Sequence, residues 1–156
     1  MLLEEAIRED IRTGGWTGNA YRVAWLSEVY RLAGRGEEAW QHACQALALA
    51  RQLKERGNEA RALPQLGVVQ AHAVPPDAEQ AEAHYQQALA LAEDLGMRPL
   101  QAHCHSGLGT LYATVGQLEQ AHTALTTAIE MYRAMDMTFW LLPAEAALAQ
   151  VGYKTP

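Results

Sequence analysis

The chain has 156 residues, of which 49% are hydrophobic and only 7% are aromatic. This length and apolar content predict one folded domain, residues 1–156, and argue against a disordered chain. The formal net charge of −6 at neutral pH gives the protein no positive field, so we expect neither nucleic acid nor a membrane surface as a partner.

The sequence repeats itself with a period of 40 to 42 residues. Each copy has an alanine followed by a large aliphatic residue, inside an Ala- and Leu-rich stretch with helical spacing. The matching pairs are Ala6-Ile7, Ala46-Leu47, Ala88-Leu89 and Ala128-Ile129. A leucine precedes the last three pairs at a similar distance, in a second helical stretch. The repeating unit is therefore predicted to be a pair of helices.

In chain order, the pattern begins with half a unit, because residues 1–13 align with the second helix of a pair. Complete units are predicted at 17–55, 58–96 and 100–137, and a final capping helix at 138–152. That helix is expected to cover the third unit with the apolar side chains of Phe139, Trp140, Leu141, Leu142, Leu148 and Val151.

Turn-forming residues separate the two helices of each unit. Gly34 and Gly116 are predicted to take a positive φ and to let the chain reverse. Pro64 lacks an N–H donor, so we expect it to shorten or kink the first helix of the second unit, with a late start of this helix as the simplest explanation. In the third unit, Gly109 and Ala121 are small enough for two antiparallel helices to approach closely.

The third unit resembles the tetratricopeptide repeat through Leu108, Gly109, Tyr112, Gly116, Ala121, Leu125 and Ala128. The first two units match less well, and Ser27 replaces the glycine of the motif. The resemblance implies an all-α fold, an α-solenoid of antiparallel helical hairpins that forms a superhelix. The period is longer than the family's usual repeat. The last sixty residues resemble the C-terminal arrays of large bacterial proteins that carry a nucleotide cyclase or a regulatory ATPase.

In such arrays the first helices line a groove that binds a protein or peptide partner. The family's pattern places the following candidate residues in this groove: Tyr21, Glu28, Arg31, Arg61, His72, His103, Ser106 and Thr110. Arg31 and Arg61 are suited to pair with an acidic or aromatic group of a partner. The alternative is that they are solvated or paired with Glu28. Trp25, Trp40 and Trp140 are expected to pack between repeats, and Trp16 to be an exposed contact.

A second interaction surface is predicted at the N-terminus. Leu2, Leu3, Ile7 and Ile11 form an apolar face that packs either against upstream repeats of a longer chain or against another copy in a homodimer. The main expectation is thus a protein-interaction scaffold within a larger bacterial signalling or regulatory protein. Homo-oligomerisation and small-molecule sensing are the alternatives.

The sequence offers no chemistry of its own. His103 and His105 flank Cys104, but residues two apart on a helix point to nearly opposite sides and cannot hold one metal ion. The chain has no G-x-S-x-G, H-E-x-x-H or phosphate-binding loop motif. We therefore expect no enzymatic activity, no metal and no cofactor.

The distribution of cysteines and charges also bears on the compartment. Cys44 and Cys104 are far apart and form no C-x-x-C motif, which suits a reducing environment. The start of the chain carries acidic residues within its apolar stretch, and no run approaches the roughly 20 apolar residues of a membrane span. A cytoplasmic location is the expectation.

Overall fold

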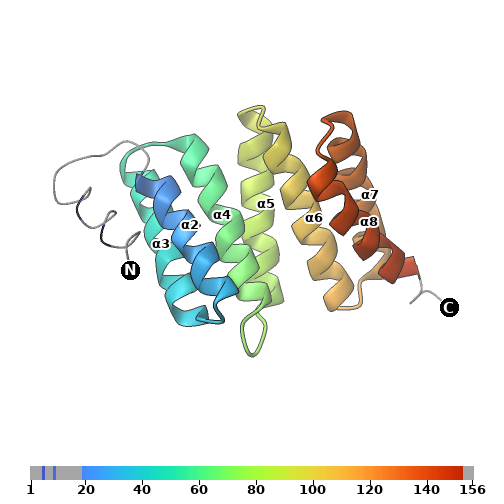
Figure 1. Cartoon of the computed structure of the whole chain (residues 1–156), viewed down its shortest axis with the longest axis horizontal. Coiled ribbons are helices and arrows are strands. Elements are labelled where there is room, and N and C mark those ends of the chain that lie inside the picture. Colours follow the sequence, from blue (N-terminus) through green and yellow to red (C-terminus); the bar gives the residue numbers. More distant parts are fainter. Residues whose placement is uncertain (1–4, 6–8, 10–18, 153–156) are drawn as a thin grey trace. The chain divides into compact units, whose positions relative to one another are not determined.

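The computed structural model describes residues 19–152 together with Glu5 and Glu9. This part of the chain contains helices and no strand, which confirms the prediction of an all-α fold (Figure 1). Helices that follow one another in sequence pack together within each of two compact units, residues 1–77 and 78–156, as in an α-solenoid. Within the described residues, no helix is both long enough and apolar enough to cross a membrane.

The first unit contains α2 (Asn19–Leu32), α3 (Gly36–Gln52) and α4 (Arg56–Ala71). Helix α2 packs on both α3 and α4. The buried face of α3 carries small side chains where it lies against its neighbours. Four alanines on this face have no exposed area: Ala39, Ala43, Ala46 and Ala50. Ser27, where the tetratricopeptide motif has glycine, is also fully buried, and its hydroxyl donates a 2.8 Å hydrogen bond to the Ala39 carbonyl. The hydroxyl is therefore satisfied where it is buried.

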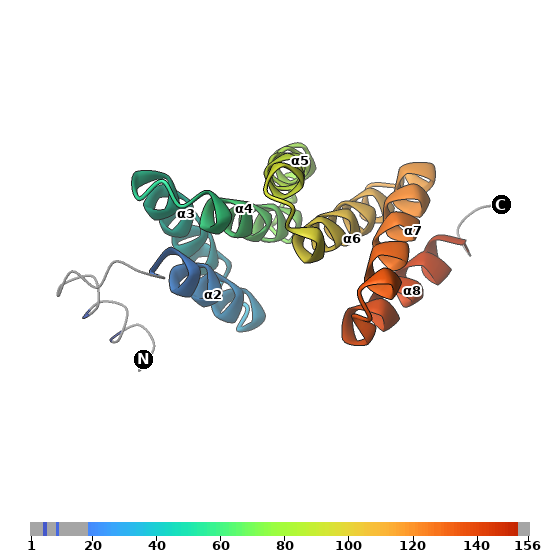
Figure 2. The ribbon, with the colours of Figure 1, turned by 90° about the horizontal axis from the view of Figure 1, so that it is seen from above.

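The second unit contains α5 (Ala78–Asp94), α6 (Arg98–Thr114), α7 (Leu118–Ala134) and α8 (Thr138–Gly152). Each helix packs on the next one, and α8 also contacts α6 (Figure 2). Gly109 of α6 lies against Leu125 of α7 so closely that a Cβ on Gly109 would be 2.6 Å from Leu125 Cγ. This confirms the predicted close approach of the two helices in the third unit.

Except for the longer connection between α4 and α5, the turns between helices share one hydrogen bond, in which a backbone N–H reaches the carbonyl five residues earlier. Two examples are Arg35 to Tyr30 and Gln117 to Tyr112, both 2.9 Å. The residue before each of these donors has a positive φ, 74° at Gly34 and 82° at Gly116, as predicted. Lys54 and Asp136 take the same conformation at φ of 57° and 54°, although they are not glycines.

The expected late start of the helix at Pro64 is wrong. Helix α4 begins at Arg56 and continues through Pro64 to Ala71. Leu63 and Leu66, on either side of the proline, are each only 2% exposed. Burial of these side chains against the rest of the unit offsets the hydrogen bond that the proline cannot donate.

Helix α8 buries one face and leaves another open. Val151 and Ala144 are each 2% exposed, and Leu141 and Leu148 pack against the core cluster formed with α7. Phe139 and Leu142, which the sequence pattern assigns to this contact, remain 77% and 69% exposed. The reason is geometric, because one side of α8 faces α7 and α6 and the opposite side has no neighbour among the described residues.

Candidate partner-binding surface

The predicted groove residues of the first unit come from two neighbouring helices. Tyr21, Glu28 and Arg31 lie on α2, Arg61 lies on α4, and His72 directly follows α4. All five are exposed or half-buried, and the structure places them on elements that pack against each other. They form what we call the α2–α4 surface.

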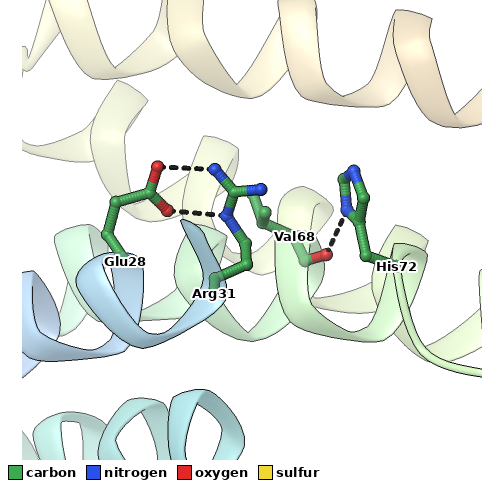
Figure 3. A network of polar contacts seen from close by, with 4 residues as sticks. All are labelled: Glu28, Arg31, Val68 and His72. Carbon is green, nitrogen blue, oxygen red and sulfur yellow. Dashed lines mark hydrogen bonds and ion pairs between the residues drawn. The ribbon is translucent and has the colours of Figure 1, made fainter. Parts of the chain in front are cut away.

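Arg31 and Glu28 are paired with each other. Arg31 Nε donates to Glu28 Oε2 at 2.8 Å, and Arg31 Nη2 donates to Glu28 Oε1 at 2.7 Å (Figure 3). The hydrogen bond from Arg31 is the main reason that the pKa of Glu28 lies below its usual value, although partial burial acts in the opposite direction. The pairing alternative is therefore what the structure shows, and a partner's acidic group would have to compete with Glu28 for this guanidinium.

His72 is held at the end of α4 by its own helix. Its Nδ1 lies 2.8 Å from the carbonyl oxygen of Val68, so Nδ1 carries the proton and donates (Figure 3). The His72 side chain is exposed. His72 also lowers the pKa of Glu28 by its charge, which places it in the same electrostatic environment as the Glu28–Arg31 pair.

An aromatic cluster lies on the same surface. The guanidinium carbon of Arg61 is 5.8 Å from the centre of the Tyr21 ring, within the range of a cation–π contact. The Trp25 ring meets Tyr21 edge-on, with 6.1 Å between ring centroids. Tyr21 and Trp25 are 44% and 57% exposed, so the prediction that Trp25 packs between repeats is wrong. Arg61 is exposed, and within the described part of the chain it forms no ion pair.

The apolar character of this surface was not predicted from the sequence. Val29 and Leu32 are 48% and 71% exposed, and with Tyr21 and Trp25 they recur along one face of α2. The sequence does show this apolar face, because the four residues are spaced at i, i+4, i+8 and i+11. The exposed face could not be told from the buried one by this pattern, because α2 also carries apolar residues on its buried side, such as Val23 and Leu26.

A cavity of about 600 Å³ lies at one end of the α2–α4 surface. It is bounded by the turn between α2 and α3 and by the segment that follows α4. Arg31 and His72 line its polar side, and Trp40, Val69 and Val74 line its apolar side. Trp40 is half-buried there. The lining thus combines charged and polar side chains with apolar ones, and a cavity of this size can accept one side chain or a short segment of a partner.

The candidate residues of the second unit are already engaged. His103 Nδ1 lies 2.8 Å from the Tyr132 hydroxyl of α7, and the His103 ring packs edge-on to Trp140 of α8 at 4.7 Å. Burial lowers the pKa of His103. The Thr110 hydroxyl donates to the Ser106 carbonyl at 3.0 Å. His103 therefore joins three helices and is less available to a partner than the groove pattern predicts.

His105 lies in different surroundings from His103. It lines a shallow depression of about 470 Å³ with residues of α5, α6 and α7, among them Tyr112. The Tyr112 hydroxyl donates to Glu82 at 2.7 Å. Among the described residues, no three His, Cys, Asp or Glu side chains come together in a way that could hold a metal ion. The predicted self-association residues Leu2, Leu3, Ile7 and Ile11, and Trp16, lie outside the described residues.

Comparison with known proteins agrees with this architecture. Residues 77–134 match the tetratricopeptide repeat family. This segment of the chain carries the tetratricopeptide repeat. The matched segment covers α5, α6 and α7, which include the unit whose motif residues are most complete. No match was found among curated protein sequences.

Two solved structures share the fold of this chain. The apo form of RapI has a TM-score of 0.76 at 20% sequence identity, over 86% of this chain and 48% of that one. BtubC from P. vanneervenii has a TM-score of 0.71 at 20% identity, over 86% of this chain and 55% of that one. The chain thus spans about half the length of either structure. At this identity the likeness defines the fold only, and the fold is one generally used as a protein-interaction scaffold.

Proposed function

We propose that the chain is a protein-interaction module that holds a segment of a partner protein on the α2–α4 surface. The observation that carries this proposal is the cluster of Tyr21, Trp25 and Arg61, which combines exposed aromatic rings with an exposed cation. Aromatic and arginine side chains are the residue types that contribute most to binding at protein interfaces. The surface acts by binding alone, without chemistry of its own.

The chemistry of the surface defines the partner segment. An apolar or aromatic side chain of the partner packs on Tyr21 and Trp25, and an acidic side chain next to it pairs with Arg61. A further side chain of the segment occupies the cavity beside Trp40. The pairing of Arg31 with Glu28 leaves Arg61 as the cation of this surface that an acidic group reaches without displacing another carboxylate.

The test is affinity capture from the source cells with quantitative mass spectrometry. We expect at least one protein to be enriched about tenfold by the wild-type chain and to be lost with the double variant Trp25→Ala/Arg61→Glu. Arg98→Glu is the matched control, because it makes the same charge change at an exposed residue of α6. Capture of the same partners by wild type and double variant would exclude the α2–α4 surface. Failure of every variant and the wild type to capture a partner would contradict the proposed function itself.

Purified partner segments then allow a direct measurement. We expect peptides of the captured protein that combine an aromatic and an acidic residue to bind by isothermal titration calorimetry. Their affinity should fall with rising salt, because the contact with Arg61 is electrostatic. Binding that is equally strong to Arg61→Glu would show that the acidic residue is not recognised by this side chain.

We also propose that the module belongs to a larger bacterial signalling or regulatory protein in the cytoplasm. The support is the resemblance of the last sixty residues to the arrays attached to nucleotide cyclases and regulatory ATPases. An antibody raised against the 156-residue chain should detect a much larger protein in cell extracts. A band at the size of the chain itself would contradict this proposal and leave the interaction function intact.

A further inference from the structure

Helix α8 is apolar on nearly all sides, which is unusual for a helix with an exposed face. Its only charged residue is Glu145, whose carboxylate pairs with Arg133 of α7. Globular proteins usually cover such a helix on more than one side. In the described residues, however, α8 packs only on α7 and α6 (Figure 2).

The open side of α8 is a continuous stripe of uncharged residues. Phe139 and Leu142 are 77% and 69% exposed, and Ala146 and Ala149 are also exposed. These four residues recur at i, i+3, i+7 and i+10, so they share one face of the helix. We call them the α8 outer stripe. Large apolar side chains next to small ones are typical of a surface that receives another helix.

Comparison with α6 shows what kind of helix fits this stripe. A shift of one 40-residue period places Leu142 at the position of Ala102, and Ala149 at the position of Gly109. In α6 these two residues are covered by α7. Ala102 is fully buried in a cluster with Ala128 and Ile129, and Gly109 lies directly under Leu125. The α8 outer stripe is therefore the face on which a first helix of the repeat receives its second helix.

The chain itself carries a segment with the pattern of that second helix. In the repeat alignment, Leu3 and Ala6 correspond to Leu125 and Ala128, which cover α6. The segment 1–13 thus has the leucine and the small residue that α7 uses in the equivalent contact. Its charged residues meet no charge on the α8 outer stripe, so electrostatic repulsion does not oppose the contact.

We propose that a second copy of this chain docks its residues 1–13 on the α8 outer stripe. The contact is head to tail, because each copy offers one donor segment at its start and one acceptor stripe on α8. It continues the stacking of second helix on first helix that holds the rest of the repeat together. The inference goes beyond the proposed function, because it uses α8 and not the α2–α4 surface, and either can fail without the other.

The first test is the mass of the chain in solution by light scattering after gel filtration, from low to high micromolar concentration. We expect the average mass to rise with concentration beyond that of one chain. The acceptor variant Leu142→Glu/Ala149→Glu and the donor variant Leu3→Glu/Ile7→Glu should each stay monomeric. Gln87→Glu is the matched control, because it adds a charge to an exposed residue of α5, away from α8, and should self-associate like the wild type.

Mixing the two monomeric variants tests the head-to-tail geometry directly. The acceptor variant retains an intact donor segment and the donor variant retains an intact stripe, so an equimolar mixture should form a dimer that neither forms alone. Circular dichroism should show unchanged helicity in each, and Ala146→Arg provides a second acceptor variant if the first is poorly folded. A monomeric wild type, a self-associating acceptor variant or a mixture without dimer would each overturn the proposal.

Discussion

The Nδ1 atom of His103 and the hydroxyl oxygen of Tyr132 lie 2.8 Å apart and connect α6 to α7. Tyr132 is 1% exposed, and burial raises its pKa to about 12, so its hydroxyl keeps its proton and donates to the neutral imidazole. Trp140 of α8 covers the same imidazole. A residue predicted to face a partner is thus part of the contact between three helices.

This arrangement makes the second unit sensitive to acid. Burial lowers the pKa of His103, so the unfolded chain binds a proton at a higher pH than the folded chain does. The neutral His103 side chain therefore contributes fully to the free energy of unfolding above pH 6.5, which is about the pKa of histidine in the unfolded chain. This contribution is lost as the pH falls from there towards the lower pKa of His103 in the folded protein. We expect the urea concentration at the midpoint of unfolding to decrease as the pH is lowered from 7.5 to 5.

The matched variants separate His103 from other groups. His103→Gln keeps an acceptor for Tyr132 but cannot bind the proton, so its urea midpoint should decrease less over the same pH range. Some decrease should remain, because burial also lowers the pKa of His105. His122→Gln, at an exposed position of α7, is the control. An equal decrease in His103→Gln and the wild type would show that His103 does not cause the acid sensitivity.

A second prediction concerns the close contact of α6 with α7. Gly109→Ala adds a Cβ only 2.6 Å from Leu125 Cγ and 3.1 Å from the Leu125 backbone nitrogen, so the helices must separate. We expect a loss of about 1 to 3 kcal/mol in the free energy of unfolding, as for overpacked cores. Gly36→Ala is the control, because no atom lies within 4 Å of the added Cβ and alanine favours the helix.

Urea unfolding of both glycine variants provides the measurement. In Gly36→Ala the midpoint should stay the same or rise, while in Gly109→Ala it should fall. The cost of Gly109→Ala should also be smaller in a Leu125→Ala background, because the clashing side chain is then absent. An unchanged midpoint in Gly109→Ala would mean that the two helices are not packed as closely as the structure shows.

The repeat was predictable because it depends on residues that every unit needs. The Ala and Leu positions recur with the period of the helix pairs, and Gly34 and Gly116 mark reversals that require a positive φ. Lys54 and Asp136 make the same reversal with side chains that seldom adopt it, so their turns gave no signal in the sequence. These two residues take a positive φ because the helices before and after them pack antiparallel, which requires the chain to reverse its direction at that point.

Exposure was harder to predict than helix position. Trp25 and Leu142 are apolar residues on helical faces, and the pattern alone assigns such residues to a core. Whether they are covered depends on which neighbours a helix has, and both α2 and α8 have a side that meets no described helix. Arg61 was identified as a candidate from the repeat pattern, but its contact with Tyr21 is a relation between two helices that only the structure shows.

The two cysteines should differ in reactivity. Cys104 has no exposed area, and burial raises its pKa to about 12, whereas Cys44 is only half-buried, and burial raises its pKa as well. The thiolate is the reactive form, and access to it is also needed. We expect iodoacetamide at pH 8 to label Cys44 slowly in the folded protein and Cys104 only after unfolding in urea.

Intact-mass spectrometry follows the labelling. Cys44→Ser should remain unlabelled in the folded protein and gain one label in urea. Cys104→Ser should gain its label without denaturant. Labelling of Cys104 in the native protein at the rate of Cys44 would show that α6 opens away from its neighbours on the timescale of the reaction.

The last prediction concerns the two prolines inside helices. Pro64 in α4 cannot donate to the carbonyl of Ala60, and its ring crowds that carbonyl, a backbone penalty of about 3 kcal/mol in a helix interior. Pro64 is also buried, so Pro64→Ala loses about 0.8 kcal/mol for each buried ring carbon removed. The balance favours alanine, and we expect Pro64→Ala to raise the free energy of unfolding by about 1 kcal/mol.

Pro143 in α8 allows the two contributions to be separated. It carries the same backbone penalty, but its ring is exposed, so Pro143→Ala removes the penalty with little loss of burial. Urea unfolding should therefore show a larger gain for Pro143→Ala than for Pro64→Ala. A lower midpoint for Pro64→Ala would mean that packing of the proline ring against its neighbours outweighs the missing hydrogen bond, and that α4 depends on this residue for its contacts within the first unit.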